Sequence, residues 1–350
     1  MKIHGVELRN FMLFDELKTE FSPNMNIIIG ENSTGKTALL KALYASEKCW
    51  RNHNTNSLRG VFRPINEDIF RLANRQRTNK RTVMKVVFHD AGSFSFGFGG
   101  EKMSRPNYPS MDALRDSESA VYIPTGEMLS HTENFASLYE KYHIPFDETC
   151  YALVRLLDLP QMRKLPEALK AVAEALEKTI GGKVVQEGRV FYLLVNDTER
   201  IEMSLVSDGY RKLATLLALL QSGALADGSI LLWDEPEANM NPRMAQTLVN
   251  ALIAVAGAGV QVFVTTHDFF VQQYFGLAST YKEKYGADAG KLDLRFFSLY
   301  RETVERDGRP DSIIKIESAA RLVDLKHNAV TEESDILGDR EMRLYYGDDA

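Results

Sequence analysis

Gly30-Glu31-Asn32-Ser33-Thr34-Gly35-Lys36-Thr37 matches the pattern G-x4-G-K-[ST] in full. An apolar run from Met25 to Ile29 precedes it and predicts a buried strand, and a helical spacing of apolar residues runs from Lys36 to Cys49. The two glycines allow the backbone to curl so that its N–H groups converge on phosphate oxygens. The start of the following helix adds positive partial charge at the same place. The stretch therefore predicts a phosphate-binding loop between a strand and a helix.

Two side chains of this loop have a predicted chemical role of their own. The Lys36 ammonium can reach the β- and γ-phosphates of a nucleoside triphosphate as a point charge. The Thr37 hydroxyl can hold Mg²⁺, which prefers oxygen ligands. We therefore expect residues 30–37 to bind a nucleotide together with Mg²⁺.

A second apolar run, Ile230 to Trp233, ends in two adjacent carboxylates, Asp234 and Glu235. Ligands of open α/β sheets bind at the carboxyl ends of the strands. Asp234 is predicted to hold Mg²⁺ through water, opposite Thr37. Glu235 is predicted to polarise the attacking water. A bare pair of acids is more often a solvated strand end, and it is the phosphate loop earlier in the chain that favours the catalytic interpretation.

Two weaker signals lie on either side of these acids. Ser207 and Gly209 open an apolar helix at 210–221, which is a second place where a helix start can bind an anion. His267 follows the apolar strand 260–266 and can donate a hydrogen bond to a γ-phosphate. Taken alone, Ser207 reads as a helix cap and His267 as a packing residue, so each depends on the rest of the pattern.

The composition of the chain excludes several classes of protein. Its 350 residues include 42 basic and 48 acidic side chains, for a net charge of -6, which argues against a wholly basic nucleic-acid coat. The two cysteines, Cys49 and Cys150, fit a reducing cytosol and cannot form a metal cluster alone. No apolar run reaches the ~20 residues that a membrane span needs, and the first residues lack a signal-peptide pattern. We expect a soluble cytoplasmic protein with no membrane partner.

Together and in this order, the motifs resemble the ATP-binding-cassette (ABC) class of ATPases. More narrowly they resemble the branch that contains RecF, the SMC-type heads and the OLD-like bacterial AAA family ATPases. The stretch Trp233-Asp-Glu-Pro-Glu-Ala-Asn-Met-Asn-Pro242 is similar to the D-E-P-E-x-x-L-H-P wording of that branch and differs from the D-E-P-T-x-x-L-D wording of transporters. Asn241 replaces the usual histidine, and Ser207-Asp208-Gly209 stands for the family's S-G-G signature. The motifs cover residues 1–45 and 200–270, under half of the chain.

The resemblance implies a composite site for ATP and Mg²⁺ between two head domains. One head would supply the loop residues Gly30 to Thr37, the acids and the histidine, so Lys36, Glu235 and His267 would be catalytic and Thr37 and Asp234 would hold the metal. The other head would supply Ser207 and Gly209. The family's Q-loop glutamine has no counterpart here: Glu127 is the nearest residue, and we leave the Q-loop and the adenine contacts unassigned.

The expected fold is α/β: a P-loop NTPase with an ABC-ATPase-like head, whose mixed central sheet is flanked by helices, plus an inserted lobe. We expect the ATPase core over residues 1–50 and 200–330, an inserted β/helical lobe over 51–199, and an acidic tail over 331–350. Sustained heptads are absent, which argues against a long coiled-coil arm. Only 83 residues follow His267, so we expect an ATPase without its own nuclease domain.

Two charged segments suggest partners. Residues 71–85 carry six basic side chains without an acid among them, and either contact with DNA or RNA phosphates or a solvated loop explains them. Residues 331–350 hold seven acidic and two basic residues, which fits a docking surface or a disordered tail.

We expect a homodimer that forms around ATP, able to assemble further, and that acts as a sensor or switch for a separately encoded effector in bacterial anti-phage defence. That last step is analogy from the family. The alternative is a RecF-like ATPase of DNA repair that binds DNA directly. A transporter ATPase is disfavoured by the wording after Asp234, and a scaffold that only binds ATP is disfavoured by Glu235.

Overall fold

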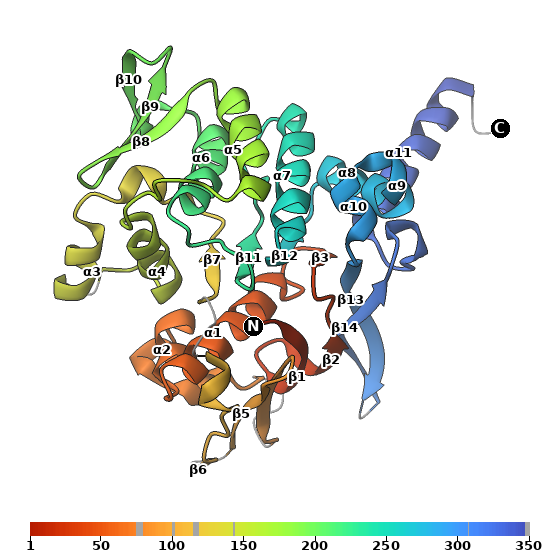
Figure 1. The fold of residues 1–350 in the computed structure, drawn as a ribbon. Coiled ribbons are helices and arrows are strands. Elements are labelled where there is room, and N and C mark those ends of the chain that lie inside the picture. The colour runs from red at the N-terminus through yellow and green to blue at the C-terminus, as the bar shows by residue number, and fades with distance from the viewer. Residues whose placement is uncertain (75–79, 100–101, 115–118, 143, 307, 347–350) are drawn as a thin grey trace.

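A six-stranded mixed sheet forms the centre of the molecule (Figure 1). The computed structural model describes residues 1–74, 80–99, 102–114, 119–142, 144–306 and 308–346. The strand order is β14-β13-β3-β12-β11-β7, with β14 antiparallel to β13 at one edge and all other neighbours parallel. The strands are β3 (Met25–Gly30), β7 (Val121–Ile123), β11 (Ile230–Asp234), β12 (Gln261–Thr266), β13 (Leu294–Arg306) and β14 (Arg309–Ala319). A helix joins β11 to its parallel neighbour β12, which is the crossover connection that a parallel pair needs.

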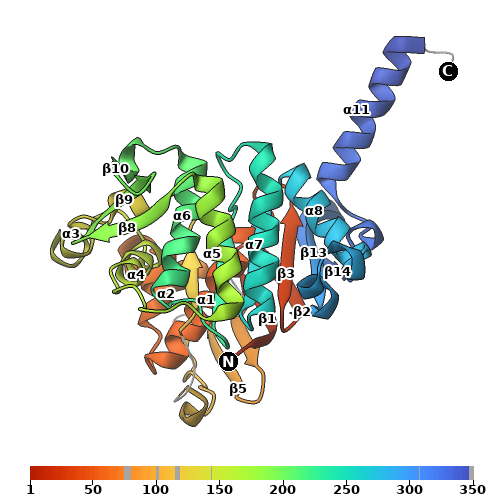
Figure 2. The same ribbon diagram turned by 45° about the horizontal axis from the view of Figure 1, so that its top comes forward.

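Both faces of this sheet are covered, as its nearly continuous apolar strands require. On β3, Ile27 and Ile29 enter one hydrophobic cluster and Ile28, between them, enters another. The first cluster includes side chains of α5 (Glu167–Ile180), α6 (Asp208–Gln221), α7 (Ala245–Gly257) and α8 (Phe269–Thr280), which lie over one face in Figure 2. The second cluster includes α1 (Lys36–Arg51) and α2 (Asn56–Phe62). The expected α/β fold, with helices on both sides of a mixed sheet, is confirmed.

A five-stranded antiparallel sheet covers α1 on the side away from the central sheet, and its inward side chains belong to the same cluster as α1. Its order is β2-β1-β4-β5-β6. The strands are β1 (Ile3–Phe11), β2 (Phe14–Glu20), β4 (Thr82–Phe88), β5 (Gly92–Gly99) and β6 (Lys102–Met103). Within this sheet, β4 and β5 pair as antiparallel neighbours.

The expected lobe at 51–199 is not set apart from the core. β4 lies between β1 and β5, and β7 pairs with β11, so two segments of this range complete the sheets of the core. The rest forms a helical part with α3 (Phe135–Tyr142) and α4 (Glu148–Leu157), and a three-stranded sheet of β8 (Lys183–Glu187), β9 (Val190–Val195) and β10 (Glu199–Glu202). The domain boundaries themselves stay a prediction.

Beyond the core, two short helices, α9 (Lys282–Tyr285) and α10 (Ala287–Lys291), precede β13, and α11 (Ala329–Tyr346) covers most of the acidic tail. α11 projects from the body and buries none of its residues (Figure 2). Within the described ranges, no helix combines the length and the apolar character that crossing a membrane requires.

Candidate active site

The loop that follows β3 has a backbone that only glycine fits at two positions. Gly30 has φ 148° and Gly35 has φ 98°. A Cβ on Gly30 would lie 2.4 Å from the Leu299 carbonyl oxygen, and one on Gly35 would lie 2.6 Å from the Phe14 ring. Both contacts are shorter than real Cβ atoms allow, so the loop needs its two glycines for space as well as for φ. Gly35 is also the N-cap of α1, so the N-terminus of that helix lies at the loop.

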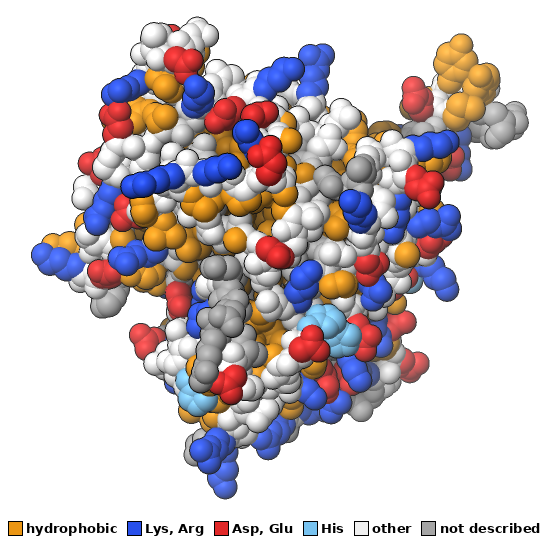
Figure 3. All heavy atoms as spheres, in the orientation of Figure 1, with side chains coloured by type: hydrophobic (Ala, Val, Ile, Leu, Met, Phe, Trp, Pro, Cys, Tyr) orange, Lys and Arg blue, Asp and Glu red, His pale blue; other side chains and the backbone are white. Residues whose placement is uncertain are grey.

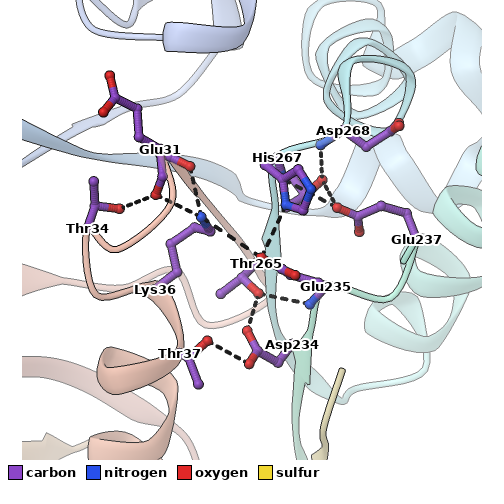
Figure 4. A network of polar contacts seen from close by, with 12 residues as sticks. Glu31, Thr34, Lys36, Thr37, Asp234, Glu235, Glu237, Thr265, His267 and Asp268 are labelled. Carbon is purple, nitrogen blue, oxygen red and sulfur yellow. Dashed lines mark hydrogen bonds and ion pairs between the residues drawn. The ribbon is translucent and has the colours of Figure 1, made fainter. Parts of the chain in front are cut away.

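Lys36 lies at the centre of the loop, with its side chain only 5% exposed. Its Nζ donates to the carbonyl oxygens of Gly30 at 2.8 Å and Glu31 at 3.0 Å and lies 4.0 Å from Oε1 of Glu235 (Figure 4). Burial lowers the pKa of this ammonium, and the nearby carboxylates, Glu235 first among them, oppose that shift. The Lys36 ammonium is therefore held inside the loop, at the place where the phosphates are predicted to bind.

The two residues predicted to hold the metal lie in direct contact. The Thr37 hydroxyl donates to Oδ2 of Asp234 at 2.7 Å. Thr265 donates to the other oxygen, Oδ1, at 2.6 Å, because β11 and β12 pair with Asp234 directly opposite Thr265. Tyr122 on β7 lies 3.4 Å from Oδ2. A hydroxyl and a carboxylate oxygen that lie side by side are hard ligands, and this donor set fits Mg²⁺.

Glu235 and His267 form a second pair at the same sheet edge. Nδ1 of His267 lies 3.1 Å from Oε1 of Glu235, and the Glu235 N–H donates to the Thr265 hydroxyl at 2.9 Å. Glu235 has φ 47°, a left-handed backbone that a residue with a side chain rarely adopts. The strain turns its carboxylate out of the strand direction and toward Lys36 (Figure 4).

The structure adds side chains for which the sequence analysis gave no role. Glu237 is buried, and accepts hydrogen bonds from the Thr266 hydroxyl at 2.6 Å and the His267 N–H at 3.2 Å. Burial raises the pKa of Glu237, while these hydrogen bonds lower it. Thr265 orients both Asp234 and Glu235. The sequence signal for Glu237 and Thr265 was their place in two stretches, Asp234-Glu-Pro-Glu and Thr265-Thr-His, that end apolar strands. The pairing of β11 with β12 brings these two stretches together.

A pocket of about 330 Å³ opens above this loop. Its polar side consists of loop residues with Lys36, Thr37 and Glu235. Its apolar side comes from Met12 and Leu13, in the turn between β1 and β2, and from Phe62 at the end of α2. These apolar residues were not found from the sequence, because they come from two segments far from the loop along the chain.

Ser207 and Gly209 lie elsewhere. Ser207 is exposed at the start of α6, and its side chain makes no capping hydrogen bond. Gly209 is buried, and a Cβ there would lie 3.3 Å from Met240. Among the described residues, neither is recorded in contact with the loop 30–37; α6 reaches the site only through Lys212, whose Nζ donates to the Glu235 carbonyl at 3.3 Å. The structure therefore brings together the loop, the acids and His267, and leaves Ser207 and Gly209 apart from them.

Glu127, the residue nearest to the expected Q-loop position, is turned toward α6. It accepts hydrogen bonds from the Ser130 hydroxyl and N–H, and it forms a 3.0 Å ion pair with Arg211. None of its described contacts involves Asp234 or the loop, so the Q-loop remains unassigned.

Thr265→Val is expected to lower the free energy of unfolding by about 1–3 kcal/mol, because it leaves the Glu235 N–H and a buried Asp234 oxygen without their partner. ATP turnover should fall as well, since both acids lose their orientation. Chemical denaturation and steady-state ATPase assays measure the two effects. Thr179→Val is the control, because its hydroxyl bonds only the preceding turn of α5 at an exposed position; equal losses in the two variants would refute the role of Thr265.

Comparison with known proteins agrees with this geometry. Residues 97–271 match the family described as "AAA domain, putative AbiEii toxin, Type IV TA system", and residues 1–151 match the AAA ATPase domain family. RecF of Lactococcus lactis, a DNA replication and repair protein, is 48% identical over 44 residues, which cover 13% of this chain and 12% of RecF. RecF of Lactobacillus gasseri is 46% identical over 63 residues, or 18% of this chain and 17% of that protein. The chain thus matches less than a fifth of the length of these relatives.

The fold is similar to that of a solved SMC head, which was crystallised with the C-winged helix domain of ScpA. The TM-score is 0.55 at 12% identity, over 91% of this chain and 98% of the SMC chain. This likeness shows the fold alone, and it confirms the head-like arrangement of the sheet and its helices. With half of its length matched by one family, the chain belongs to this family of AAA domains and is an ATPase domain with the fold of an SMC-type head.

Proposed function

We propose that the protein is an ATP-hydrolysing switch in which two copies close around ATP and Mg²⁺. The observation that carries this proposal is the division of the predicted site. Phosphate loop, metal ligands and Glu235 lie together on one chain, whereas Ser207, the predicted contact to the γ-phosphate, is exposed at the start of another helix. A second copy that presents its own Ser207 would complete the site.

The residues present fit ATP and Mg²⁺. Lys36 and the N–H groups of residues 30–37 would hold the phosphates, and Thr37 and Asp234 would hold the metal, which when bound neutralises phosphate charge. The apolar side of the pocket, formed by Met12, Leu13 and Phe62, would receive the adenine ring. Each group would therefore meet a surface of matching chemistry.

For hydrolysis, the Glu235 carboxylate would accept a proton from the attacking water as the water meets the γ-phosphate. His267 lies beside that carboxylate and so within the same reaction space. Lys36 would stabilise the negative charge on the transferred phosphoryl group. Glu237 would act as a positioning residue, because its carboxylate accepts a hydrogen bond from the His267 N–H.

For the biological role, we propose control of a separately encoded effector in anti-phage defence. The description of the matched family, which names a toxin of a toxin–antitoxin system, supports this role. The projecting α11 is our proposed docking element for the effector, and assembly beyond the dimer remains part of the proposal.

A specific observation keeps direct nucleic-acid binding as the second candidate. Within the basic stretch, Arg75 and Arg77 lie outside the described residues, but Arg71, Lys80, Arg81 and Lys85 are placed. Among the described side chains, none of these four lies within ion-pair distance of a carboxylate, so no described acid compensates their charge at short range. On the face drawn in Figure 3, however, basic and acidic side chains are interspersed and form no single field. Stimulation of ATPase activity by DNA would favour this repair-type role.

If the site is shared between two copies, ATPase activity per chain should rise with protein concentration until dimers saturate, and ATP should tighten the dimer more than ADP does. Ser207→Arg should block closure and should lower turnover without loss of ATP binding, because a cation is disfavoured at a helix start. ATPase assays over a dilution series, with ultracentrifugation at the same concentrations, measure this.

Ser222→Arg is the matched control, since it places the same charge at the other end of α6, where the helix dipole favours it. Activity per chain that stays constant at dilutions where only monomers sediment in ATP would contradict the shared site.

A further inference from the structure

A second pocket on the described part of the chain lies apart from the phosphate loop. Its volume is about 880 Å³, against about 330 Å³ for the loop pocket. It lies between α2 with the segment 63–67 on one side and α3 with residues 144–146 on the other, in the region of Figure 1 where α2 lies beneath α4. Pockets of about 300–1,000 Å³ are the usual size for small-molecule sites. None of the predicted site residues lines it.

Two arginines, Arg59 and Arg63, and one acidic residue, Glu67, line this pocket, so the basic side chains outnumber the acidic one. Arg59 donates to the Glu67 carbonyl oxygen at 3.1 Å and to the Asn56 amide oxygen at 3.4 Å. Arg63 donates to the carbonyls of residues 144 and 146 at 3.3 and 2.7 Å. All these acceptors are neutral, and among the described residues no carboxylate is in ion-pair distance of either guanidinium. Each guanidinium has five N–H donors, so both retain donors for an anion.

The opposite wall of the pocket is aromatic, and each of its two rings packs against another aromatic ring. Tyr139 stacks on Tyr151 with ring centroids 4.7 Å apart and planes at 16°. Phe146 packs edge-on against Phe135 at 5.0 Å, and 41% of its surface remains exposed. Tyr139 also lies nearly parallel to Phe135, with centroids 6.3 Å apart and planes at 19°. Phe146 is therefore the more open of the two rings and the one better suited to stack on a planar ligand group.

The rim of the pocket is strained. Arg63, Asn66 and Glu67 have φ of 44°, 58° and 55°, the left-handed region that residues other than glycine rarely occupy. Such strain persists only where the surroundings impose it, and it is concentrated at ligand-binding and switch segments. Here it turns the segment 63–67 back over α2, so that Arg63 reaches residues 144–146.

This pocket is connected to the loop pocket at two places. Phe62 lines the loop pocket, and the next residue, Arg63, lines the larger one. Lys41, on the loop pocket, forms a 2.6 Å ion pair with Asp147, which follows directly on Phe146 and caps α4. A ligand that moves Arg63 or Phe146 would therefore displace groups that line the loop pocket.

We propose that this second pocket binds a small ligand of the nucleotide class, with its phosphate on Arg59 and Arg63 and its base against Tyr139 and Phe146. The ligand regulates ATP turnover through Phe62 and the Lys41–Asp147 ion pair. The proposal does not depend on dimerisation or on the identity of an effector.

The test uses full-length Lys36→Ala protein, in which the loop site is disabled, and calorimetry with AMP, GMP, cyclic AMP, cyclic GMP and inorganic phosphate. At least one nucleotide should bind with micromolar affinity, and inorganic phosphate should bind much more weakly, because it lacks the ring. Adding Arg63→Gln should weaken that nucleotide by about ten-fold or more, since it removes a charge-assisted contact. Arg200→Gln, an exposed arginine on β10, should leave it unchanged.

Phe146→Ala provides an independent variant, which should weaken the nucleotide and leave phosphate binding unaltered. Circular dichroism verifies folding of each variant. ATP binding by the same substitutions, made in protein that retains Lys36, verifies that the loop site is intact. Absence of nucleotide binding in the Lys36→Ala protein, equal affinity of the Arg63→Gln variant, or phosphate binding as tightly as nucleotide would each overturn the proposal. In the wild-type background, the bound nucleotide should change the rate of ATP hydrolysis; an unchanged rate would refute the regulatory part.

Discussion

Glu235→Gln is expected to lower ATP turnover by about 10²–10⁴-fold while ATP binding persists. The substitution keeps the size of the side chain and its hydrogen bond to His267, and it removes only the carboxylate that would accept the proton from water. Because Lys36, Thr37 and Asp234 are unchanged, the affinity for ATP should stay close to the wild-type value. Single-turnover assays measure the hydrolysis step, and calorimetry measures binding separately.

Glu31→Gln is the matched control for this experiment. Glu31 lies in the same loop, but only its backbone carbonyl contacts Lys36, and its side chain points away from the network (Figure 4). The control should hydrolyse ATP at nearly the wild-type rate. If Glu235→Gln does so too, another group accepts the proton and Glu235 is not the catalytic carboxylate.

The parts of the site that could be predicted from the sequence are those formed by contiguous residues. Residues 30–37 form a loop whose two glycines and flanking strand and helix are all local. β3 and α1 begin where the pattern predicts, and they end one and two residues later than predicted, at Gly30 and Arg51. The apolar run that ends at Asp234 is equally local. The strand ends could then be placed together, because parallel neighbours present their carboxyl ends at one edge.

What the sequence could not supply depends on pairings between distant segments. The position of β4 between β1 and β5 follows from strand partners that lie 74 to 85 residues apart on β1 and β4, and no local pattern encodes that choice. The support of Asp234 by Thr265 depends on the exact register of β11 against β12. Met12, Leu13 and Phe62 meet the loop only after the antiparallel sheet and α2 have packed on α1. The trans role of Ser207 stays a prediction, since it concerns a second copy.

Lys36→Ala is expected to weaken ATP binding by about 100-fold or more and to abolish turnover, because charge-assisted contacts to two phosphates are lost together. Lys36 lies in the middle of the loop, held by two carbonyl oxygens, and the structure places no other described lysine or arginine side chain in hydrogen bond with those carbonyls.

Thermal unfolding with and without ATP and Mg²⁺ measures the effect of Lys36→Ala on ATP binding without an activity assay. A ligand at 100 times its Kd stabilises the folded wild-type protein by about 2.7 kcal/mol, and the variant should show almost none of this gain. Lys18→Ala, an exposed lysine on β2, should retain the full gain. Equal stabilisation of the Lys36→Ala variant by ATP would show that the phosphates bind elsewhere, and it would refute the assignment of residues 30–37 as the phosphate loop.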